Sequence, residues 1–92
     1  MKLNTDRLAM LPRDRAAAVA HQVLNPISTL TPEEQMAGAA VLFYVLCHRN
    51  GLTGADMHSM AERMIRPQPF HRKGNVQIEA LQDFAGFTHP TT

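Results

Sequence analysis

Positively charged side chains gather in one short segment of the sequence. Within eleven residues the segment holds an aromatic residue, a histidine and four arginine or lysine residues, interrupted by two prolines. These candidate partner-binding residues are Arg63, Arg66, Phe70, His71, Arg72 and Lys73. Cationic groups beside an aromatic ring suit an acidic protein surface, or phosphates with stacked bases. The composition is also typical of a solvated connector between helices, so three interpretations stay open.

The other residues that could act as metal ligands or nucleophiles are histidines and the single cysteine. His48, Asp56 and His58 could approach one another across a short turn, and His21 or Cys47 could add a ligand. Their spacing matches neither HExxH nor paired CxxC zinc ligands, so we predict no metal and no cofactor. Cys47 ends an apolar run and is expected to be buried, where a thiol reacts poorly. No nucleophile elbow or phosphate-binding glycine loop is present, and we predict that the protein is not an enzyme.

Helices must position these groups, and the clearest of them is apolar. The twelve residues Met36–Cys47 carry no charge. Thr31 and Glu34 form a capping-box pattern before the run, and Gly51 after it is a stop signal. We therefore predict a helix over Pro32–Arg49. Because a helix that is apolar on every face must be covered on every face, we predict that the other helices pack around it.

Three further helices are predicted from one-sided apolar spacing and from capping residues. Their predicted ranges are Pro12–Leu24, Gly54–Ile65 and residues 76–85, the last capped by Asn75. A methionine stripe, Met57, Met60 and Met64, is expected to pack in the core. Residues 1–11 are expected to form an N-terminal turn, and residues 88–92 a frayed tail.

Residues 32–66 resemble the helix-turn-helix unit of DNA-binding proteins. Leu46, Leu52, Met57 and Met60 fall at roughly the spacings that this unit uses for its internal core. The resemblance implies nucleic-acid binding, with the basic segment adding phosphate contacts. The first half of the implied recognition helix offers Asp56 rather than arginine or lysine, which disfavours contact with phosphates. Nucleic-acid binding is therefore the alternative function.

The composition limits the fold class, the kind of partner and the cellular location of the protein. A chain of 92 residues, 45% hydrophobic and poor in aromatic residues, predicts a single all-α domain over residues 1–92. The formal net charge of +1 does not indicate a polyanionic partner for the molecule as a whole. One cysteine excludes an internal disulfide, and the apolar run is too short to cross a membrane. We expect a cytoplasmic protein.

These observations predict a compact four-helix, all-α domain around a central apolar helix. The predicted function is that of a small non-enzymatic adaptor or modulator that binds a larger protein partner through Arg63–Lys73. If three covering helices leave part of the apolar run exposed, that side becomes a homodimer or partner surface. The small residues Gly38, Ala39 and Ala40 would then allow a second helix to approach closely.

Overall fold

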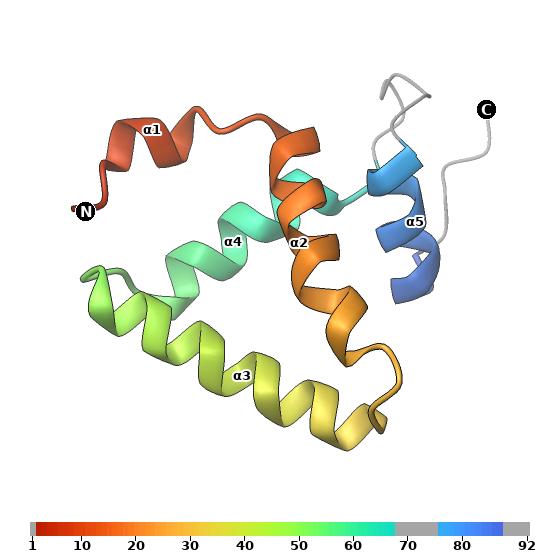
Figure 1. Ribbon diagram of the computed structural model, residues 1–92. Coiled ribbons are helices and arrows are strands. Elements are labelled where there is room, and N and C mark those ends of the chain that lie inside the picture. Colours follow the sequence, from red (N-terminus) through yellow and green to blue (C-terminus); the bar gives the residue numbers. More distant parts are fainter. Residues whose placement is uncertain (1, 68–75, 88–92) are drawn as a thin grey trace.

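The computed structural model describes residues 2–67 and 76–87, and every regular element in these ranges is an α-helix (Figure 1). The helices are α1 (Thr5–Ala9), α2 (Arg13–Ile27), α3 (Pro32–Arg49), α4 (Gly54–Ile65) and α5 (Val76–Ala85). The all-α prediction is confirmed. The expected N-terminal turn is the fifth helix, α1, which begins where the Asn4 side chain accepts hydrogen bonds from the N–H groups of Asp6 and Arg7.

The ends of α3 follow the sequence signals closely. The Glu34 N–H donates to the Thr31 hydroxyl (3.2 Å), and the Thr31 N–H donates to the Glu34 carboxylate (3.0 Å), which completes the predicted capping box. The hydrogen bond from the Thr31 N–H is the main cause that lowers the pKa of the Glu34 carboxyl. A hydrogen bond from the Thr31 hydroxyl lowers the pKa further. At the other end Gly51 has φ +66°, and the Leu52 N–H donates to the Cys47 carbonyl (2.9 Å). This is a Schellman termination, so both predicted ends are confirmed.

α2 runs three residues past its predicted end at Leu24 and stops at Ile27. Pro26 lies in the last turn and cannot donate the backbone hydrogen bond of that position, and the helix continues for only one residue beyond it. The Ser28 hydroxyl and N–H both donate to the Asn25 carbonyl, at 2.8 and 3.2 Å, and close the helix there. The sequence predicts an earlier end because Asn25-Pro26 follows Leu24 directly, and a proline and the residue before it both disfavour helix.

The helices pack into a compact arrangement in which α2 contacts α5 most extensively and α4 contacts α2, α3 and α5. The Gln82 side chain is only 2% exposed, and its Nε2 donates to the Ile65 carbonyl (2.8 Å). From α2, Arg13 Nε donates to the Met64 carbonyl (2.6 Å). Two helices therefore supply donors to carbonyls that the end of α4 cannot pair internally. The most deeply buried side chains in the described ranges are Ala17, Cys47, Ile78 and Gln82.

α3 does not lie at the centre of the fold, which corrects the prediction of a central, fully covered helix. It lies along one edge of the molecule and packs on α4 (Figure 1). Cys47 is its only buried residue, whereas Val41, Tyr44 and Met36 are 64%, 70% and 71% exposed. The reason is geometric, because α2 and α3 diverge from their short link and α2 packs on α5 instead. The structure thus matches the second expectation, in which part of the apolar run stays uncovered.

Replacing Gln82 with alanine is expected to lower the free energy of unfolding by about 1–3 kcal/mol, because the Ile65 carbonyl loses its donor inside the fold. Urea unfolding followed by circular dichroism measures the change. Gln22→Ala on the exposed side of α2 is the matched control, expected within about 0.5 kcal/mol of the parent. Equal effects of the two substitutions would contradict a structural role for the α4–α5 hydrogen bond.

Candidate functional site

The structure describes the beginning of the basic segment. Arg63 is exposed in the last turn of α4, and Arg66 is the C-cap residue. The Arg66 guanidinium lies 3.2 Å from the Glu62 carboxylate, with 65% of the Arg66 side chain exposed. Such an exposed pair holds its side chains only weakly, so Arg66 remains accessible to an acidic group. The other predicted site residues, Phe70, His71, Arg72 and Lys73, lie outside the described residues.

The base of this segment is held by neighbouring helices. The hydrogen bonds from Arg13 and Gln82 end on Met64 and Ile65, which lie between the two arginines in the sequence. The carboxyl end of a helix also favours positive charge through its dipole. Arg63 and Arg66 are therefore displayed from a helix end that is fixed on two sides.

A groove of about 380 Å³ lies between α1 and α4. Leu8, Met57 and Met60 contribute apolar lining, while Asp56 and Arg63 contribute charge. The two methionines are half-buried, so their predicted packing in the core is only partial. With one acidic and one basic side chain, the groove shows no preference for either sign of charge.

The histidines and the cysteine do not form a common site in the described part of the chain. His21 Nε2 lies 3.0 Å from the Gln77 carbonyl on α5, whereas the His48 ring stacks on Tyr44 with centroids 6.1 Å apart. Cys47 is 8% exposed and lines a hollow of about 180 Å³ where α3 turns into α4. Within residues 2–67 and 76–87, no group of three His, Cys, Asp or Glu side chains could hold a metal ion.

α3 and α4 form a helix–turn–helix hairpin without a strongly basic outer side. A Cβ added to Gly54 would lie 3.4 Å from the Phe43 ring, which shows that the two helices approach closely at this point. The exposed positions of α4 include Asp56 and Glu62 as well as Arg63, so acidic and basic charges nearly balance. Phosphate binding depends on clustered positive charge. The hairpin therefore has the connectivity of the DNA-binding unit but lacks its charge on the described residues of α4.

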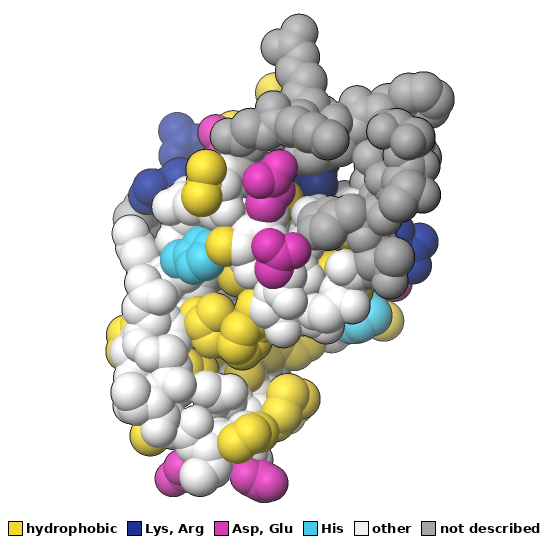
Figure 2. Space-filling view, turned by 90° about the vertical axis from the view of Figure 1, so that its right-hand side faces the viewer, with side chains coloured by type: hydrophobic (Ala, Val, Ile, Leu, Met, Phe, Trp, Pro, Cys, Tyr) yellow, Lys and Arg dark blue, Asp and Glu magenta, His cyan; other side chains and the backbone are white. Residues whose placement is uncertain are grey.

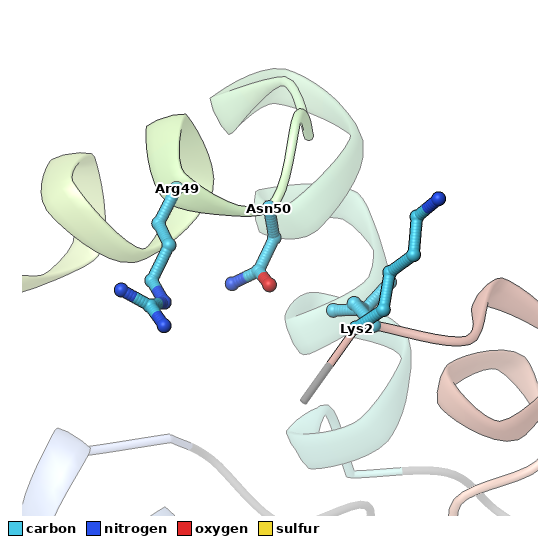
Figure 3. Close-up of a pocket in the computed structure, with 4 residues that line it drawn as sticks. Lys2, Arg49 and Asn50 are labelled. Atoms are coloured by element: carbon cyan, nitrogen blue, oxygen red, sulfur yellow. The ribbon is translucent and has the colours of Figure 1, made fainter.

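An open hollow of about 550 Å³ lies between the N-terminal segment and the end of α3. Lys2, Leu3, Arg49 and Asn50 line it. The charged ends of Lys2 and Arg49 point away from one another (Figure 3), and the Asn50 amide donates to the Leu46 carbonyl (2.8 Å). The two cations do not converge, so we assign no binding role to this hollow.

α3 carries more exposed large hydrophobic side chains than any other described helix. They are Met36, Val41, Leu42, Phe43, Tyr44, Val45 and Leu46. Viewed from the right-hand side of Figure 1, hydrophobic side chains reach the surface over the lower half of the molecule (Figure 2). The sequence predicted that these side chains are covered and placed the candidate site residues in the basic segment. The exposure of α3 matches the other expectation, in which an uncovered side of the run is a homodimer or partner surface.

One side of α3 forms a continuous strip that we call the α3 seam. It consists of Ala37, Gly38, Val41, Tyr44, Val45 and His48, which recur every three or four residues and so share one side of a helix. Cys47 and Phe43, which pack near α4, lie on the other side. This spacing within the apolar run was the sequence signal that could have identified the surface.

A scan of protein-family models, a comparison with curated proteins and a comparison with solved structures each found no match to this chain. Among the helices in the described ranges, none combines the length and apolar content needed to cross a bilayer.

Cys47 is expected to react with Ellman's reagent at least about tenfold more slowly in the folded protein than in urea. The folded structure must open locally before the reagent can reach the buried thiol. The absorbance of the released thiolate measures the rate. Thr29→Cys in a Cys47→Ser background places a thiol on the exposed link between α2 and α3 and serves as the control. A native Cys47 that reacts as fast as this control would contradict its burial.

Proposed function

We propose that this chain is a small non-enzymatic interaction protein, an adaptor or modulator that binds a larger protein partner in the cytoplasm. The observation that carries the role in association is the exposed apolar surface of α3, on which Val41 and Tyr44 are 64% and 70% exposed, while the larger partner is assigned to the basic segment. Contiguous apolar surface of this kind is typical of proteins that act by association. Covering it with another chain removes apolar area from water and is favourable.

The larger partner binds at Arg63–Lys73 through an acidic surface. Four arginine or lysine residues within eleven positions give this segment its charge complementarity. Arg63 and Arg66 emerge from a helix end that Arg13 and Gln82 hold in place, which reduces the entropy lost on binding. In Figure 1 this end of α4 lies beside α2 and α5 and away from α3, so the two surfaces do not compete.

Nucleic-acid binding is the second candidate function, supported by the α3–turn–α4 hairpin and the same basic segment. Because Asp56 and Glu62 offset the arginines on α4, nucleic acid would depend mainly on Arg63–Lys73. Its signature is an affinity that falls steeply with added salt, since phosphate contacts release counterions. The absence of a mobility shift with duplex DNA or RNA at low salt would remove this candidate.

The triple variant Arg66→Ala/Arg72→Ala/Lys73→Ala tests the proposed partner site. Tagged full-length protein is incubated with nuclease-treated extract of its native host, and the captured partner is quantified. We expect the variant to recover the partner at least about tenfold less well, because three charges that face an acidic surface are lost.

A second triple variant, Lys2→Ala/Arg7→Ala/Arg15→Ala, removes the same number of exposed positive charges elsewhere and is expected to bind normally. Unchanged capture by the Arg66/Arg72/Lys73 variant would contradict the proposed site. A partner that the parent protein captures from untreated extract but not from nuclease-treated extract would favour the nucleic-acid function instead.

A further inference from the structure

We propose that the α3 seam pairs with the α3 seam of a second copy of this chain, in antiparallel orientation, to form a twofold-symmetric dimer. The inference rests on the proposed function, because it names what covers the exposed surface of α3. Four properties of the seam support it: its exposure, its spacing, its side-chain sizes and the charges at its ends.

The seam is uncovered in the described chain. Val41, Tyr44 and Val45 are all more than half exposed, and a Cβ placed on Gly38 would meet no atom within 4 Å. The side of α3 that does pack carries the buried Cys47, about 120° around the helix from Val41. A second helix can therefore reach the seam without displacing α4.

The spacing of the seam suits a helix pair. Its positions follow the alternation of three and four residues that keeps one side of a helix against a partner helix. The 18 residues of α3 make a helix about 27 Å long. Two such helices can therefore remain in contact over several turns.

Side-chain sizes along the seam favour an antiparallel pair centred on Val41. The small residues Ala37 and Gly38 precede Val41, and the large residues Tyr44 and Val45 follow it at matching distances. A twofold axis at Val41 sets the small pair of each copy opposite the large pair of the other. A parallel pair would instead set Tyr44 against Tyr44, which produces a clash, and Gly38 against Gly38, which leaves a gap.

The charges at the ends of α3 favour the same orientation. The first turn carries Glu33 and Glu34, and the last turn carries His48 and Arg49. An antiparallel pair brings the acidic end of each helix beside the basic end of the other, at both edges of the interface. A parallel pair would oppose like charges at both ends, which disfavours association.

The dimer is expected to be reversible. A single pair of helices covers less than the roughly 800 Å² per partner of a typical stable complex, so we expect a dissociation constant in the micromolar range. The twofold arrangement would carry two Arg63–Lys73 segments. A partner with two acidic sites would then be bound more tightly through the higher effective concentration of the second segment.

Sedimentation equilibrium of the purified full chain tests the dimer. We expect a mass about twice 10.2 kDa at high protein concentration and dissociation on dilution. Val41→Lys is expected to raise the dissociation constant at least about 100-fold, because it opposes two ammonium groups at the twofold axis. Met36→Lys is the matched control, since Met36 lies on the same helix, is 71% exposed and stands outside the seam.

Cysteine cross-linking in a Cys47→Ser background tests the orientation. The two copies of position 41 meet at the axis, so Val41→Cys is expected to form a disulfide-linked dimer under mild oxidation. Two copies of position 37 would lie about 12 Å apart along the helices, so Ala37→Cys is expected to remain unlinked. A parallel pair would cross-link both variants.

A parent protein that stays monomeric, or a Val41→Lys variant that dimerises like the Met36→Lys control, overturns the proposed interface. Efficient cross-linking through Ala37→Cys overturns the antiparallel arrangement. Circular dichroism of each variant checks that the helices are retained. Because these measurements use purified protein with Arg63–Lys73 intact, a monomer that still captures its larger partner would overturn the dimer and leave the proposed function standing.

Discussion

The carboxyl end of α4 is where the described fold is held together. Its terminal carbonyls have no partners within the helix, and Arg13 from α2 and Gln82 from α5 supply donors at 2.6 and 2.8 Å. These bonds join α2, α4 and α5, and few side chains of the described fold are buried. α3 takes no part in this junction. Near its two ends it is tied to the rest by the Gln35 amide, which donates to the Ile27 carbonyl, and by the turn into α4.

Signals that depend on a few neighbouring residues predicted the helices well. The capping box at Thr31, the left-handed Gly51 and the cap at Thr53 set the bounds of α3 and α4 as the structure has them. Each works through hydrogen bonds within one turn of the chain, so no knowledge of the tertiary fold was needed. The end of α2 was missed because a proline is expected to stop a helix, whereas α2 continues one residue past Pro26 without the backbone hydrogen bond that Pro26 cannot donate.

The placement of α3 could not be predicted in the same way, because burial depends on which helices reach one another. An apolar run indicates only that burial of its surface is favourable, and not which helix buries it. In this chain α2 packs on α5 rather than on α3. The junction residues Arg13 and Gln82 were missed for the same reason, since their partners are 51 and 17 residues away. Of the candidate site, the exposure of Arg63 and Arg66 agrees with the prediction, whereas the binding of a partner there stays a prediction.

An exposed apolar helix is a risk for any protein, because it attracts other apolar surfaces without discrimination. Features of α3 limit that risk. In the proposed dimer, Glu33 and Arg49 at the ends of α3 specify direction, and the change from Gly38 to Tyr44 along the seam specifies register. A twofold pair also closes on itself, because each copy uses its seam once and no free seam remains for a third chain. The proposed self-association would therefore cover the α3 seam without forming a polymer, and it would leave the arginines at the end of α4 accessible to a different partner.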